Sequence, residues 1–105
     1  MIEIKYYRKY NRVTITGHAE SGEHGKDLVC AACSALAYTL AANVSNLSDN
    51  GLVRVESIKL EPGNAEIWAK ANSSKALVSR IIEAICVGFE IIATEYPQYV
   101  SYEIR

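Results

Sequence analysis

The stretch from residue 27 to residue 47 reads DLVCAACSALAYTLAANVSNL, and it decides the fold. Its larger apolar side chains recur every three or four positions, which is the period of an α-helix with one buried face. They are Val29, Cys33, Leu36, Leu40, Val44 and Leu47. We predict a helix that begins near Asp27 and stops at the Asp49-Asn50-Gly51 turn.

Segments of alternating character flank this helix on both sides. Residues 2–7 and 13–16 alternate in this way and predict a first hairpin, with a turn at 8–12. Residues 52–61 and 64–71 predict a second hairpin, because Glu61-Pro62-Gly63-Asn64 between them favours a tight turn. Each hairpin would place one apolar face against the helix.

A second helix is expected after Asn72-Ser73-Ser74, which supplies candidate N-cap residues. Its apolar stripe consists of Leu77, Val78, Ile81, Ile82, Ile85, Phe89 and Ile92. Pro97 ends the helical zone, and residues 100–104 alternate as a last strand. The alternation also changes phase between residues 55 and 58, which indicates a β-bulge in the third strand.

The predicted order of elements is therefore ββαββαβ. Runs of hairpins interrupted by two helices are typical of an α+β fold, in which the helices pack on a mostly antiparallel sheet. The 105 residues suit one domain, so we expect a single domain over residues 1–105.

Composition and charge limit the kinds of molecule that we expect the protein to bind. Half of the residues are apolar and the net charge is −1, with lysine and arginine spread along the chain, so we expect no direct nucleic-acid partner. Residues 28–48 form the longest uncharged stretch, but its Ala, Ser and Asn content favours a buried helix, and we expect no membrane contact. The first residues lack the pattern of a secretory signal, so we expect a cytoplasmic protein with free thiols.

Four side chains with reactive chemistry lie in one segment, GHAESGEHGKDLVCAACS, at residues 17–34. If Asp27 is the N-cap of the first helix, Cys30 is its third residue. A helix N-terminus stabilises negative charge, so it would favour the thiolate, and its free N–H groups could bind an oxyanion. The alternative is an inert cysteine in an apolar helix.

His18 follows the second strand, and a glycine-containing loop returns the chain to Cys30. Such a loop can bring the imidazole to the thiol and create a Cys–His pair. A third residue that orients the imidazole is not evident, and Asp27, Glu20 and Glu23 remain candidates. Ser34 is four residues after Cys30, on the same helical face, where it can bond the thiolate, the substrate or its own helix.

The loop glycines are Gly17, Gly22 and Gly25. They permit backbone conformations that other residues avoid, so the loop at 17–26 is either a lid over a peptide groove or a plain connector.

With these residues the sequence resembles the ribosomal-processing cysteine protease family, Prp. The matching signature is Gly17-His18-Ala19, a glycine-rich loop, and Asp27-Leu28-Val29-Cys30-Ala31-Ala32, followed by Ser34 and Ala35. The chain length and the predicted ββαββαβ order agree with the family as well, so the resemblance covers essentially the whole chain.

The resemblance implies that Cys30 is the nucleophile, that His18 is the catalytic base, and that Asp27 and Ser34 support them. It implies removal of a short N-terminal extension from a large-subunit ribosomal protein, L-twenty-seven, as an extended peptide with aromatic residues at the cut. It also implies a homodimer, and we expect neither a cofactor nor a metal.

Cys30-Ala31-Ala32-Cys33 also supports two rival interpretations, because a C-x-x-C pair can be a redox dithiol or half of a metal site. His18 and His24 would complete a Cys₂His₂ zinc site, which would make the protein a binding module. In a third interpretation Cys30 is inert and the protein is a non-enzymatic ribosome-associated protein.

Overall fold

The computed structural model describes residues 1–18 and 24–105, with the backbone alone at 24–27. Its elements are β1 (Ile2–Tyr7), a short 3-10 helix η1 (Arg8–Tyr10), β2 (Arg12–Thr16), α1 (His24–Asp49), β3 (Val53–Glu61), β4 (Asn64–Ala71), α2 (Lys75–Glu95) and β5 (Val100–Ile104). The predicted ββαββαβ order and the α+β class are confirmed.

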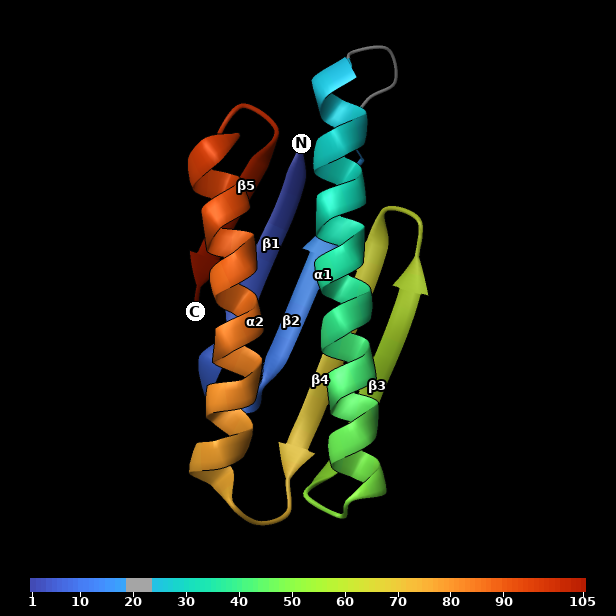
Figure 1. Cartoon of the computed structure of the whole chain (residues 1–105), viewed down its shortest axis with the longest axis vertical. Coiled ribbons are helices and arrows are strands. Elements are labelled where there is room, and N and C mark those ends of the chain that lie inside the picture. The colour runs from blue at the N-terminus through green and yellow to red at the C-terminus, as the bar shows by residue number, and fades with distance from the viewer. Residues whose placement is uncertain (19–23) are drawn as a thin grey trace.

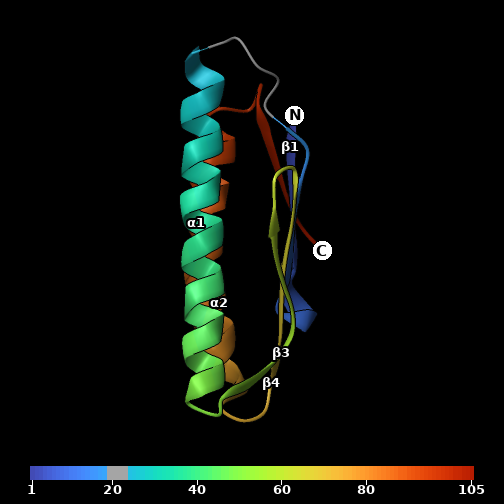
Figure 2. The same ribbon diagram turned by 90° about the vertical axis from the view of Figure 1, so that its right-hand side faces the viewer.

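The described part of the chain forms two layers. Figure 1 shows α1 and α2 side by side across one face of the sheet, and Figure 2 shows the two layers edge-on. The strand order is β3-β4-β2-β1-β5. Three neighbouring pairs are antiparallel and the β1–β5 pair is parallel, so the sheet is mostly antiparallel, as expected.

The core lies between the layers, because both helices bury the apolar stripes seen in the sequence. Leu40 and Val44 of α1 and Phe89 of α2 are fully buried. The two helices approach closely at Gly88, where a Cβ atom would lie 2.9 Å from both Cδ atoms of Leu36. A small residue at this position therefore allows the helices to pack together.

The predicted bulge in β3 is present, but the predicted N-cap of α2 is not formed as expected. The pairing of β3 with β4 shifts register between Val55 and Ser57, which confirms the bulge. Ser74 is the residue before α2, but its backbone is left-handed, with φ 51°, and its side chain makes no capping hydrogen bond. The prediction that this group of residues caps α2 through a side chain is therefore wrong for Ser74.

The start of α1 differs from the prediction as well. The helix begins at His24, so the predicted N-cap residue, Asp27, belongs to the helix itself. Residues 24–26, which were expected to belong to the loop at 17–26, are part of the helix as well. Residues 24–27 contain no apolar side chains at helical spacing, so the sequence pattern does not predict a helix there. Once a helix is nucleated, however, backbone hydrogen bonds extend it at little cost.

The apolar stripe of α1 packs in the core of the domain. By length and composition alone, residues 28–49 would be able to cross a membrane. In the fold this helix lies along the sheet and buries Val29, Leu40 and Leu47 against it. Such one-sided burial is typical of the core helix of a globular domain.

Candidate active site

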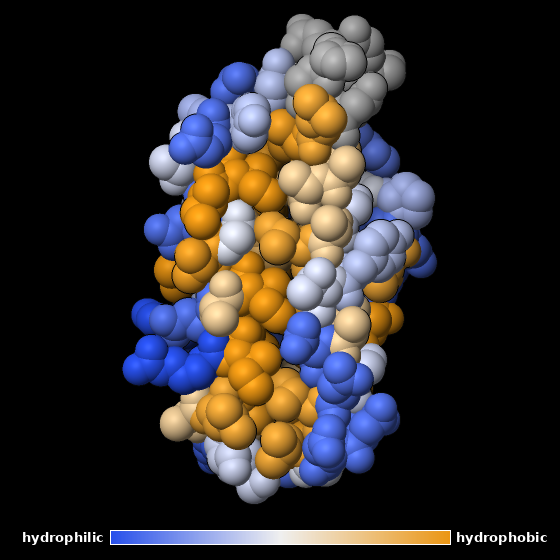
Figure 3. Space-filling model, viewed as in Figure 1, coloured by the Kyte–Doolittle hydropathy of each residue, from blue (hydrophilic) through white to orange (hydrophobic). Residues whose placement is uncertain are grey.

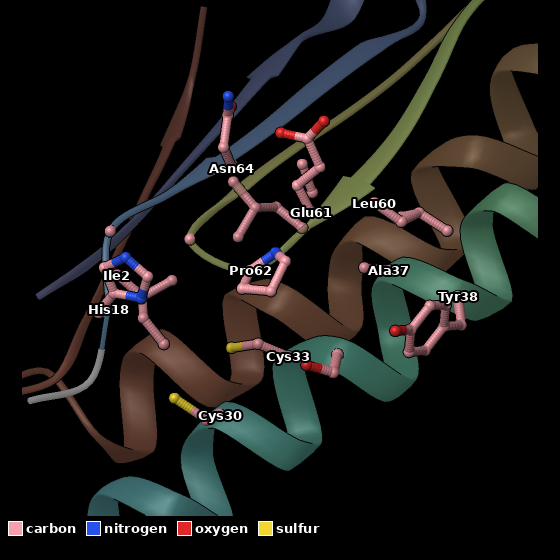
Figure 4. Close-up of a pocket in the computed structure, with 15 residues that line it drawn as sticks. Ile2, His18, Cys30, Cys33, Ala37, Tyr38, Leu60, Glu61, Pro62 and Asn64 are labelled. Carbon is pink, nitrogen blue, oxygen red and sulfur yellow. The ribbon is translucent and has the colours of Figure 1, made fainter. Parts of the chain in front are cut away.

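A cavity of about 330 Å³ opens between α1, the end of β2 and the turn that joins β3 to β4. Figure 4 shows the side chains that surround it. Its lining residues are Ile2, Ile15, Gly17, His18, Cys30, Cys33, Ser34, Ala37, Tyr38, Leu60, Glu61, Pro62, Gly63, Asn64 and Ala65. Most of the lining is apolar, and a few polar side chains converge on it, as in many ligand sites.

Cys30 lies on the α1 wall of this cavity and is partly exposed. Its sulfur points toward the side of the cavity where His18 lies (Figure 4). Because α1 begins at His24, Cys30 belongs to the second turn of the helix and not to its free N-terminal positions. The expectation that helix-end N–H groups lie at the thiol is therefore wrong, since only the first four N–H groups of a helix lack intrahelical partners.

His18 lies on the opposite wall, directly after β2 and Gly17. Its imidazole packs on Gly63 of the β3–β4 turn. Its backbone carbonyl accepts a hydrogen bond from the amino group of Met1, at 3.3 Å. Gly17 has φ 100°, and a Cβ atom there would lie 2.1 Å from the carbonyl oxygen of Met1. Only glycine therefore fits at the residue that introduces His18.

The structure thus brings His18, Cys30 and Ser34 to one cavity. Among the interactions of the described residues, no hydrogen bond joins the His18 and Cys30 side chains. Catalytic hydrogen bonds are often long or poorly aligned before substrate binds, so the absence of this bond does not exclude a functional pair. The structure shows a thiol and an imidazole that line a common space.

The other residues predicted for the site divide into two groups. Gly22 lies outside the described residues. Gly25 and Asp27 belong to the first turn of α1 by their backbone, whereas the side chain of Asp27 is not among those described, and neither is that of His24. Their predicted supporting roles stay predictions.

Comparison with known proteins decides the family. A family model described as cysteine protease Prp matches residues 1–101. The chain belongs to the Prp family. It is therefore a cysteine protease, and the interpretation as a non-enzymatic protein is wrong. A search of curated proteins finds no match.

Solved structures support the fold of this Prp-family chain. SMU.848 from Streptococcus mutans is 29% identical, with a TM-score of 0.70 over 98% of this chain and 90% of that one. The ribosomal processing protease Prp from S. aureus is 21% identical, and the alignment covers 99% of this chain and 97% of that one. Its TM-scores are 0.73 for the complex with a substrate peptide and 0.72 for that with a covalently linked product peptide.

Cys33 is a core residue in this Prp-family protein, although it lies one turn from Cys30. It is 3% exposed. Burial, and secondarily the neighbouring Cys30, raises the pKa of the Cys33 thiol to about 11. A metal site or a redox dithiol needs the thiolate, which this environment disfavours. The burial of Cys33 therefore disfavours the zinc and redox interpretations of Cys30-x-x-Cys33.

Sequence reasoning missed two kinds of residue at the cavity. Tyr38 lies four positions after Ser34 and eight after Cys30, so helical spacing alone was sufficient to place it on the same face. The β3–β4 turn, with Pro62 and Gly63, also lines the cavity. Nothing local in the sequence indicates that this turn reaches His18, because the contact depends on how β2 pairs with β4.

Proposed function

We propose that this cysteine protease removes the short N-terminal extension of a large-subunit ribosomal protein, L-twenty-seven, with Cys30 as nucleophile and His18 as base. The observation that carries the proposal is that the two side chains reach one cavity from opposite walls. The resemblance of residues 17–35 to the Prp signature supports the same assignment. We also propose that it acts in the cytoplasm, where its three cysteines remain free thiols.

The chemistry follows from a thiol and an imidazole. His18 takes the proton of Cys30, and the thiolate attacks the scissile carbonyl carbon to form a C–S bond. The imidazolium then gives its proton to the leaving amine, which departs with the electrons of the broken C–N bond. His18 next removes a proton from water, whose hydroxide attacks the thioester. The product acid leaves, and the sulfur takes back the proton from His18.

The walls of the cavity suit the proposed substrate. Ile2, Ile15 and Leu60 offer apolar surface, and a volume of about 330 Å³ admits an aromatic side chain. Ser34 and Tyr38 present hydroxyl groups on the α1 side, where they can donate to carbonyls of an extended peptide. The S. aureus protein of the same fold holds a substrate peptide in one complex and a covalently linked product peptide in another.

Intact mass spectrometry tests this function. The extended ribosomal protein of the host is incubated with the wild type and with Cys30→Ala, His18→Ala and Cys33→Ala. We expect the wild type and Cys33→Ala to release one defined N-terminal fragment, and the other two to release none. Absence of cleavage by the folded, reduced wild type contradicts the substrate. Loss of cleavage in Cys33→Ala but not in Cys30→Ala contradicts the assigned nucleophile.

We further propose that the protein is a homodimer. Beyond the family resemblance, large apolar side chains on the outer side of α2 support this. Leu77, Val87 and Ile91 are about half exposed, at 52%, 48% and 57%. Figure 3 shows hydrophobic residues along this helical face of the molecule. Helical faces of this kind often pack against a second copy.

A further inference from the structure

The imidazole of His18 occupies the space that a side chain would need at Gly63. A Cβ atom built on Gly63 would lie 2.3 Å from Cε1 of His18 and 2.4 Å from its Nε2. These separations are far shorter than ordinary carbon contacts of roughly 3.5–4.0 Å. The ring therefore packs directly on the backbone of the β3–β4 turn.

Strand register creates this contact. In the antiparallel pair of β2 and β4, Thr16 lies opposite Asn64. One step further, the N–H of Gly17 donates to the carbonyl of Gly63 at 3.0 Å. The backbone that precedes His18 is thus tied to the same residue on which its ring rests. Gly63 has φ 73°, so glycine also suits the turn itself.

We propose that Gly63 is a positioning residue for the protease, because its bare backbone supports the His18 imidazole on the cavity wall that faces Cys30. The inference rests on the proposed role of His18 as base. It adds a residue of the β3–β4 turn, which takes no part in the proposed proton transfers, to the determinants of the reaction rate.

The proposed effect is on catalysis more than on folding. His18 is exposed, so its ring can swing away from an added methyl group at small cost in stability. To restore ordinary contact the ring has to move by about 1 Å, and a displacement of that size in a catalytic group can reduce the rate by roughly 100-fold. An alanine at positive φ also strains the backbone, and this effect is separate from the contact with His18. The same substitution at another glycine with positive φ measures the strain alone.

Gly51 is the matched control. Its φ is 75°, close to that of Gly63, but a Cβ atom there meets nothing within 4 Å. Gly63→Ala and Gly51→Ala therefore introduce the same methyl group with similar backbone strain, and they differ in the contact with His18. Gly63→Asn is a third variant, because asparagine tolerates the left-handed region better than alanine yet still carries a Cβ atom.

The experiment measures kcat and KM for a peptide that spans the cleavage site, the rate of Cys30 alkylation by iodoacetamide at neutral pH, and stability by urea unfolding. We expect kcat to fall about 10- to 100-fold in Gly63→Ala and Gly63→Asn with little change in KM, and alkylation to slow as it does in His18→Ala. Gly51→Ala should keep both rates near wild type.

Equal kcat and equal alkylation rates in the Gly63 variants and Gly51→Ala would overturn the inference. The comparison does not depend on the ribosomal substrate. If the wild type leaves the peptide uncut, the proposed substrate fails, and the alkylation rates alone decide: slower alkylation in the Gly63 variants than in Gly51→Ala supports the positioning role, and equal rates reject it.

Discussion

Cys30 and Cys33 lie three positions apart on α1, but their environments differ. Cys30 is partly exposed in the cavity, whereas Cys33 is 3% exposed in the core. Since burial raises the pKa of Cys33 to about 11, almost none of it is thiolate at pH 8. Burial likewise raises the pKa of Cys86 to about 12, despite a hydrogen bond with Tyr102 that acts in the opposite direction. The two buried thiols are therefore poor nucleophiles.

This difference predicts the labelling of the native protein. At pH 8, iodoacetamide should add a single carbamidomethyl group, at Cys30, and peptide mapping by mass spectrometry locates it. Cys33 and Cys86 should react only in urea, which serves as the positive control. Labelling of Cys33 in the folded protein as fast as that of Cys30 would mean that the thiol is not held in the core as described.

At the scale of elements, Arg12 connects three neighbouring strands on the face of the sheet that the helices leave open. Its guanidinium lies 4.9 Å from the ring centre of Tyr7 on β1 and 5.3 Å from that of Trp68 on β4. Its Nε donates to the carboxylate of Glu66 on β4 at 2.7 Å. This hydrogen bond, aided by one with Ser57, holds the pKa of Glu66 below its ordinary value.

A depressed carboxyl pKa stabilises the fold above the pKa of the unfolded chain, near 4.5, and this contribution is lost as pH falls through the folded pKa. We expect Glu66→Gln to lower the free energy of unfolding by about 1 kcal/mol at pH 7 and to lose less stability than the wild type on acidification. Urea unfolding at pH 7 and below pH 4 measures both.

The matched control is Glu103→Gln, which removes an exposed pair with Arg105 at 3.2 Å. Exposed pairs contribute little, so its stability should stay close to that of the wild type. Identical acid sensitivity in the wild type and Glu66→Gln would show that the Arg12–Glu66 contact does not act as described.

The helices and strands also show which parts of the fold could be predicted from the sequence and which could not. The strands, the bulge and both helical stripes come from periodicity, which is a local property of the chain. The start of α1 was missed because residues 24–27 contribute no apolar side chain to the pattern. The contact of His18 with Gly63 was missed for a different reason: it arises from the register of β2 against β4, and register is a property of two distant segments together.

At the scale of the whole molecule, the exposed apolar side of α2 predicts where the proposed dimer forms. Ile91→Asp places a charge at a residue that is 57% exposed on that helix. We expect this variant to be a folded monomer, because burying an unpaired charge in an interface is costly. Light scattering coupled to size-exclusion chromatography reports the mass.

Ile104→Asp provides the comparison for this experiment. It introduces the same substitution at a residue that is 50% exposed on β5, the edge strand of the sheet. This variant should retain the dimer. Dissociation by Ile104→Asp alone would place the contact between copies at the sheet edge, and a monomeric wild type would contradict the dimer.

The parallel pairing of β1 with β5 has a consequence for the biosynthesis of the protease. Ile2 pairs with Val100, so the sheet reaches its final width only when almost the whole chain is available. Contacts between segments so far apart in sequence form late and slow the folding rate. Ile2 also lines the cavity that holds Cys30 and His18, so we expect the wall formed by β1 to take its final position only when β5 has left the ribosomal tunnel and paired with it. We therefore expect proteolytic activity to begin after synthesis and not during it.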